Sequence, residues 1–212
     1  KKVNTDLKDM EDYVTRHVSD YCGFHQRQRL LLRAMEVAGL SSSFFRCSGL
    51  MPSDSTPTTT PATTSEAAVR QCVRLWLSEF GLCKRLIRTY SGHETLWLHR
   101  RFLTFHWMTE LWPQIENKGL EVKGDEGEEI SYDSEISFAE LCIGDSTAER
   151  FKAQREYALT YQFWVTWLKD KREAQQQPSQ EEAIQELGKK ERLMKALEGH
   201  YPQRLPLWQQ IK

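Results

Sequence analysis

An apolar seam over residues 69–90 is the feature that most constrains the fold of this chain. Its members recur at alternating steps of four and three residues, the period of one face of an α-helix. They are Val69, Val73, Trp76, Phe80, Cys83, Ile87 and Tyr90. Ser91-Gly92 is expected to end this helix. The next helix, from about Glu94 to Trp112, is apolar on most sides, and Pro113 is expected to close it. Helices this apolar need neighbours that cover them, so the seam predicts a packed helical array.

Helical patterning also precedes and follows this pair. Apolar residues recur at helical steps over residues 5–18, and a helix is expected over residues 21–40 after a Ser19-Asp20 cap. Further along, Asp145-Ser146-Thr147 is expected to cap a long helix. A short helix is predicted over residues 179–198, because Ser179 and Glu182 have the spacing of a capping box.

Two segments interrupt the helical pattern. Residues 41–65 are crowded with Ser, Thr and Pro and are interpreted as a disordered insertion, and residues 119–135, rich in Gly and acids, as a solvated acidic loop. No pair of segments alternates apolar and polar residues as strands do. The sequence therefore predicts an all-α fold: a right-handed superhelical array, or α-solenoid, of antiparallel helical hairpins, TPR-like, forming a single domain over residues 1–212.

The composition narrows the classes of function. The 212 residues carry 29 Lys and Arg against 30 Asp and Glu, so no global field attracts nucleic acid or an anionic membrane. No stretch reaches the length of about 18 apolar residues that a bilayer crossing requires, and no transmembrane segment is expected. The five cysteines are odd in number and unpaired in spacing, which favours a reducing, cytoplasmic setting. Since helical pattern begins almost at once without an initiator Met, we expect a C-terminal fragment of a longer chain.

An internal repeat links two of the predicted helix starts. Residues 20–30 and 93–103 align, and each carries an aromatic residue three places before an Arg: Phe24 with Arg27, and Trp97 with Arg100. Positions three apart share a helix face, so each aromatic can fill a gap between hairpins while the Arg donates to carbonyls at a nearby helix end. We interpret these Arg residues as structural. The competing hypothesis of a phosphate-binding or nucleic-acid-binding patch is disfavoured by the apolar surroundings and the neutral total charge.

These two segments resemble the repeat of the protein prenyltransferase alpha-subunit family. Its motif runs Asn-Tyr-x-x-Trp-x-x-Arg at the start of the second helix of each hairpin. The stretch from Thr95 to Leu103 matches its Trp-x-His-Arg-Arg core closely, whereas the earlier copy keeps Tyr21 and Arg27 but has Asp20 for Asn and Phe24 for Trp. After residue 145 no clean third copy is found.

The resemblance implies a heterodimer and a division of labour within it. In this family the alpha subunit is a crescent of hairpins around a beta subunit, which supplies the zinc and most of the isoprenoid pocket. The chain is thus expected to bind a prenyltransferase beta subunit and a protein acceptor such as a small GTPase or a SNARE-like protein. The isoprenoid diphosphate is the co-substrate, and geranylgeranyl transfer to a C-terminal Cys is the expected reaction.

No catalytic, cofactor-binding or metal residue is assigned to this chain itself. Cys22 and His25 form a lone C-x-x-H, and the other histidines have no ligand cluster at metal spacing. The Lys and His that family members place beside the motif tyrosine are absent here. The candidate repeat-motif and partner-interface residues are Tyr21, Phe24, Arg27, Trp97 and Arg100. Of these, Tyr21 is expected to face the hairpin ends or the partner.

Two alternatives stand beside the prenyltransferase scaffold. A TPR-like protein-interaction scaffold without enzymatic association would use the same hairpins to hold a peptide. The aromatic-x-x-Arg core argues against it, because the usual TPR pattern does not contain that core. A self-sufficient enzyme ranks third, since the sequence shows no nucleophile and base pair and no glycine-rich phosphate loop.

Overall fold

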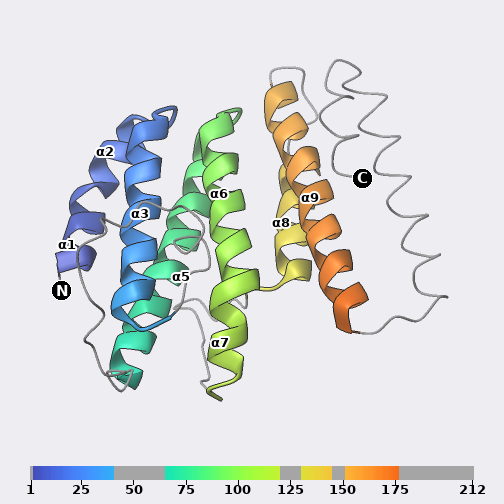
Figure 1. Ribbon diagram of the computed structural model, residues 1–212. Coiled ribbons are helices and arrows are strands. Elements are labelled where there is room, and N and C mark those ends of the chain that lie inside the picture. Colours follow the sequence, from blue (N-terminus) through green and yellow to red (C-terminus); the bar gives the residue numbers. More distant parts are fainter. Residues whose placement is uncertain (1, 41–64, 120–129, 145–150, 177–212) are drawn as a thin grey trace, which may run out of the picture. The chain divides into compact units, whose positions relative to one another are not determined.

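The computed structural model describes residues 2–40, 65–119, 130–144 and 151–176, which form helices and turns with no strand among them (Figure 1). The all-α prediction is confirmed. The superhelical course of the array stays a prediction. The helices belong to two compact units, residues 1–129 and 130–212, each described on its own below. The Ser/Thr/Pro segment up to residue 64, the cap at residues 145–147 and the helix predicted over residues 179–198 lie outside the described residues.

Unit 1 opens with three helices, α1 (Lys2–Asp9), α2 (Glu11–Arg16) and α3 (Tyr21–Val37). The single helix predicted over residues 5–18 is therefore divided at Met10, whose N–H still bonds the Asp6 carbonyl. The predicted cap of α3 is present, because the Asp20 side chain accepts from the Cys22 N–H at 2.9 Å. Such a cap satisfies one of the donors that every helix start leaves without a partner.

The first six members of the seam predicted over residues 69–90 lie on α5 (Glu66–Thr89) and are buried, whereas Tyr90 follows the end of the helix. Gly92, with φ of 84°, makes the turn into α6 (Glu94–His106). The helix does not stop at Trp112 as predicted. It continues through a π-helical turn, η1 (Trp107–Leu111), into α7 (Trp112–Glu116). Pro113 is tolerated because it stands in the first turn of α7, where its missing N–H removes no helical hydrogen bond.

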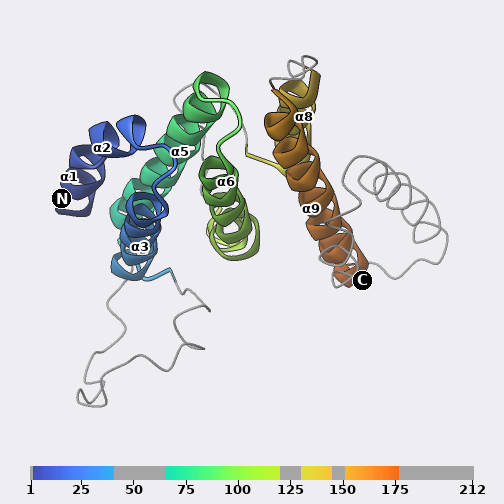
Figure 2. The same ribbon diagram turned by 90° about the horizontal axis from the view of Figure 1, so that it is seen from above.

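Helix α5 packs against both α3 and α6, and α3 also packs against α6. In Figures 1 and 2, α3 and α6 run as neighbours along one side of α5. These are the two helices whose first turns carry the repeated motif. The motif residues of both copies therefore meet around the same partner helix.

Unit 2 contains an antiparallel pair, α8 (Tyr132–Gly144) and α9 (Lys152–Gln176). Helix α9 confirms the long helix expected after residue 147. Helix α8 was not predicted, and it makes the last four residues of the supposed acidic loop, 132–135, helical. Reciprocal hydrogen bonds between Ser131 and Ser134 fix its first turn, which the acidic composition of the preceding stretch concealed. No described helix is long and apolar enough to cross a membrane.

Candidate functional site

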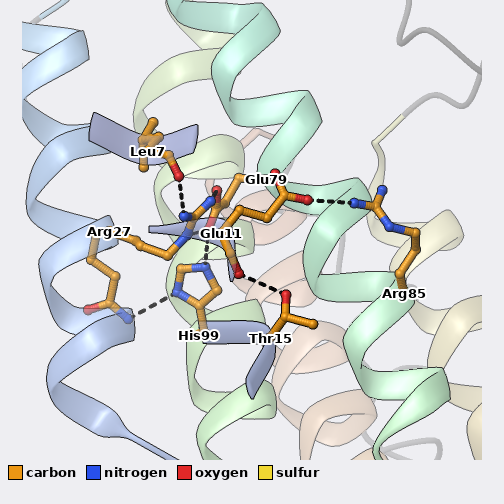
Figure 3. Close-up of polar contacts among 8 residues, drawn as sticks. Leu7, Glu11, Thr15, Arg27, Glu79, Arg85 and His99 are labelled. Atoms are coloured by element: carbon orange, nitrogen blue, oxygen red, sulfur yellow. Dashed lines mark hydrogen bonds and ion pairs between the residues drawn. The ribbon is translucent and has the colours of Figure 1, made fainter. Parts of the chain in front are cut away.

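A buried polar cluster joins α3, α5 and α6 at the level of the repeat motif. Its centre is Glu79 of α5, with a side chain 3% exposed. Arg27 of α3 binds both carboxylate oxygens, Nε donating to Oε1 at 2.7 Å and Nη2 to Oε2 at 2.6 Å. Figure 3 shows the guanidinium facing the carboxylate between the helices. Such a two-pronged pair holds a fixed orientation as well as a charge. We call Arg27, Gln28, Glu79 and His99 the Glu79 cluster.

His99 of α6 completes the cluster. Its Nε2 lies 2.8 Å from Glu79 Oε1, and its Nδ1 lies 3.4 Å from the amide nitrogen of Gln28. An ionised carboxylate only accepts and an amide nitrogen only donates, so these partners assign the proton of a neutral imidazole to Nε2. The imidazole thereby bridges α3 and α5, and the buried charges of Arg27 and Glu79 pair with each other.

The surroundings keep Glu79 ionised. Burial acts to raise the pKa of its carboxyl, but the hydrogen bonds from His99 and Arg27, together with the charge of Arg27, outweigh burial and lower the pKa from 4.5 to about 2. Removing the partner of such a carboxylate is strongly destabilising, because an uncompensated charge would remain in the interior. The cluster therefore holds the two motif-bearing helices, α3 and α6, together through Glu79 of α5.

The two motif arginines share one further contact, which shows that the two copies fold alike. Arg27 Nη1 donates to the Leu7 carbonyl at 2.6 Å, and Arg100 Nη1 donates to the Phe80 carbonyl at 2.8 Å. Each acceptor lies 20 residues before its arginine, on a preceding helix. Leu7 stands in the last turn of α1, where carbonyls lack helical partners, as predicted. Phe80 stands inside α5, so this acceptor of Arg100 is not at a helix end. The Arg100 guanidinium also lies 4.8 Å from the Phe80 ring centroid.

The other predicted motif residues divide between interior and surface. Phe24 and Trp97 are buried, with 2% and 4% of their surface exposed, and the Phe24 ring lies 5.0 Å from that of His99. Tyr21 is 52% exposed, and its hydroxyl donates to Glu94 Oε2 at 3.3 Å. The structure thus places four of the five predicted residues inside unit 1 and Tyr21 on its surface.

The surface around Tyr21 is formed by the turns that precede α3 and α6. Ser19 Oγ lies 2.7 Å from His93 Nδ1, and the Thr95 hydroxyl donates to the Ser19 carbonyl at 3.3 Å. Both contacts cross between residues more than 70 positions apart, so the two motif starts lie side by side. The sequence places Ser19 in a predicted helix cap and Thr95 at the start of the second motif copy, and it does not bring the two together.

Sequence reasoning also missed Glu79. A signal was available, because this residue is a carboxylate on the buried side of the apolar seam, between Trp76 and Cys83. A charged residue at such a position is almost always paired. What the sequence could not supply was the pair of helices that provide its partners.

The histidines and cysteines expected to have no metal role are placed individually. Cys22 and His25 are exposed on α3, whereas His99 faces Glu79 and His106 lies 3.0 Å from Glu110 Oε2. In the part of the chain that the structure describes, no three His, Cys, Asp or Glu side chains gather as ligands of one metal ion.

Comparison with known proteins identifies the repeat. The family model described as "Protein prenyltransferase alpha subunit repeat" matches residues 76–107, the stretch that holds Glu79, Trp97, His99 and Arg100. The chain is 31% identical over 152 residues to "Protein prenyltransferase alpha subunit repeat-containing protein 1" of Danio rerio, covering 70% of this chain and 33% of that protein. It is 34% identical over 106 residues to the Homo sapiens protein of the same name, covering 47% and 26%. No solved structure matches the chain.

These matches confirm the resemblance inferred from the motif. The chain carries the repeat of the prenyltransferase alpha subunits and is related to the repeat-containing proteins. It spans about a third of the length of the Danio rerio protein and about a quarter of the human one.

Proposed function

We propose that this chain is part of an alpha-like scaffolding subunit of a heterodimeric protein prenyltransferase, which binds a catalytic beta subunit and the protein acceptor. The observation that carries the proposal is the shared geometry of Arg27 and Arg100, each bonded to a carbonyl 20 residues earlier. That geometry lies partly within the stretch matched by the family model and recurs in the copy before it. Two copies built alike support a repeat architecture, and the family's repeat belongs to alpha subunits.

In this proposal the chemistry resides on the partner. The beta subunit would supply the zinc that holds the acceptor cysteine as a thiolate, and most of the pocket for the isoprenoid diphosphate. The thiolate sulfur would attack the first carbon of the isoprenoid, a geranylgeranyl group in our proposal. The carbon–oxygen bond breaks, diphosphate leaves and a thioether forms. The contribution of this chain would be to hold the partner and the acceptor, because its two motif arginines are engaged in bonds within unit 1.

The surface available for that task lies on α3 and α6. Leu98 and Phe105 are 42% and 40% exposed, and their spacing of seven residues places them on one face of α6. Tyr21 is exposed at the start of α3, the helix that packs beside α6. Exposed apolar and tyrosine side chains suit the centre of a protein interface. We propose these three residues as contacts of the partner subunit.

The experiment is co-expression of the full-length natural protein with a panel of prenyltransferase beta subunits. We expect one beta subunit to co-purify, and the complex to transfer labelled geranylgeranyl from its diphosphate to a small GTPase or SNARE-like acceptor. Failure of every beta subunit to co-purify, with no isoprenoid transfer, would contradict the proposal. Capture of peptides but never of a beta subunit would favour the TPR-like scaffold.

A second experiment tests the surface. Phe105→Asp and Leu98→Asp are expected to reduce co-purification at least tenfold, because each places a charge in the centre of the contact. Val37→Asp is the matched control, since Val37 is an apolar residue 67% exposed at the far end of α3. Equal retention of the partner by all three folded variants would place the interface elsewhere.

A further inference from the structure

The helical pair of unit 2 contains a buried acid that is bonded by a side chain of the second helix, as Glu79 is bonded by His99 in unit 1. Glu135 of α8 is 1% exposed, and the hydroxyl of Tyr161, itself 3% exposed, donates to its Oε2. In unit 1, Glu79 lies on the first helix of a hairpin and is bonded by His99 of the second. Fully buried carboxylates are uncommon, so finding one in the same role in both hairpins calls for a common explanation.

The surroundings of the two acids match on the first helices. Three, four and seven residues after each acid the side chain is buried: Leu82, Cys83 and Leu86 follow Glu79, and Phe138, Ala139 and Cys142 follow Glu135. Any packed amphipathic helix shows burial at such steps. The feature that sets α5 and α8 apart from other amphipathic helices is the acid, which occupies the same place in the buried stripe of each.

The second helices match as well. Four and five residues after the donor of each acid lie a branched apolar residue and a threonine: Leu103 and Thr104 follow His99, and Val165 and Thr166 follow Tyr161, and all four are buried. A threonine is a poor helix former that is seldom found inside. Because it recurs at the same distance from the donor, it sets the alignment of the α9 sequence with the α6 sequence.

We propose that α8 and α9 form a third, diverged copy of the repeat, in which Glu135 and Tyr161 take the places of Glu79 and His99. In this register Leu159 stands where Trp97 does, and Gln162 where Arg100 does. Both residues that define the motif therefore differ in this copy, which is why the motif alone does not reveal it. What α8–α9 shares with the α5–α6 hairpin is the buried acid, its hydrogen-bond donor and the threonine. The inference is independent of the proposed function, because it concerns only how the hairpin is built.

The test exchanges the donors. If the hairpins are copies, a histidine at position 161 stands where His99 stands and can donate to the acid. We expect Tyr161→His to keep the thermal unfolding midpoint within about 3 °C of the parent, whereas Tyr161→Phe, which removes the hydroxyl donor, lowers it by about 3 to 8 °C. An equal loss in both variants would overturn the inference.

A spectroscopic readout distinguishes a shared role from simple tolerance. In Tyr161→His, the nitrogen-15 shifts of the new imidazole are expected to show a protonated ring nitrogen donating to a carboxylate. Adding Glu135→Gln should change those shifts. Glu140→Gln is the control, because Glu140 is an exposed carboxylate on the same helix. Imidazole shifts that respond equally to both substitutions, or to neither, would also overturn the inference.

Discussion

The two copies of the motif in unit 1 satisfy the same carbonyl contact but differ in what surrounds the arginine. Arg27 adds a two-pronged ion pair with Glu79 of the following hairpin, whereas Arg100 adds a stacking contact with Phe80. The bond to the carbonyl 20 residues earlier is thus the element that these two copies share. The additional contacts of the two arginines differ in strength, because a buried ion pair is much more sensitive to loss of one partner than a stacked ring is.

The largest expected effect comes from removing the acid on which the first copy depends. Glu79→Ala leaves the Arg27 guanidinium buried without its counter-ion and should lower the free energy of unfolding by about 3–5 kcal/mol. Urea unfolding followed by circular dichroism measures it. Glu66→Ala is the control, because Glu66 makes an exposed pair with Arg70 on the same helix, and its loss should cost less than about 1 kcal/mol. Similar losses in the two variants would show that the Glu79 cluster does not stabilise the packing of α3, α5 and α6.

The same cluster should make stability depend on acid pH. The folded pKa of Glu79 is lowered to about 2 from 4.5, so the folded state binds fewer protons than the unfolded state between these values. Its contribution, about 3 kcal/mol from the size of this shift, is present in full above pH 4.5 and is lost as the pH falls towards 2. Comparing acid titrations of the parent and Glu79→Gln checks this. Identical pH dependence in the two proteins would refute the assignment.

Substituting each arginine by lysine sharpens the comparison between copies. Lysine keeps the charge but cannot bind two carboxylate oxygens and a carbonyl at once. We expect Arg27→Lys to cost about 1–2 kcal/mol more than Arg100→Lys, because one fork of hydrogen bonds is lost beyond the shared carbonyl bond. Urea unfolding of both variants gives the difference. A larger cost for Arg100→Lys would reverse the order we assign to the two sites.

Some of this arrangement could be read from the sequence, and some could not. The spacing of Phe24 with Arg27 and of Trp97 with Arg100 predicted both helix starts and the packing role of the aromatics, because that spacing is a local property of a helix. The partner of Arg27 could not be predicted. Glu79 is 52 residues away, and only the packing of α3 on α5 brings them together.

Two misses in helix boundaries have local causes. Pro113 reads as a stop in sequence, yet a π-helical turn directly before it lets the chain enter a new helix with proline in its first turn. Helix α8 begins within an acidic stretch, and its start depends on the bonds between Ser131 and Ser134. Net composition over a window conceals such a start, since one turn of capping decides it.

The smallest expected effect on stability, and the most informative about function, lies at Tyr21, the motif residue on the surface. Its counterpart in the second copy is Glu94, the residue to which its hydroxyl donates at 3.3 Å. Tyr21→Phe removes only that exposed hydrogen bond and should change the free energy of unfolding by less than about 0.5 kcal/mol. Tyr21→Ala also removes the exposed ring. If the ring contacts a partner subunit, co-purification should fall with Tyr21→Ala and persist with Tyr21→Phe. Full retention of the partner by both variants would leave the first copy with a purely internal role.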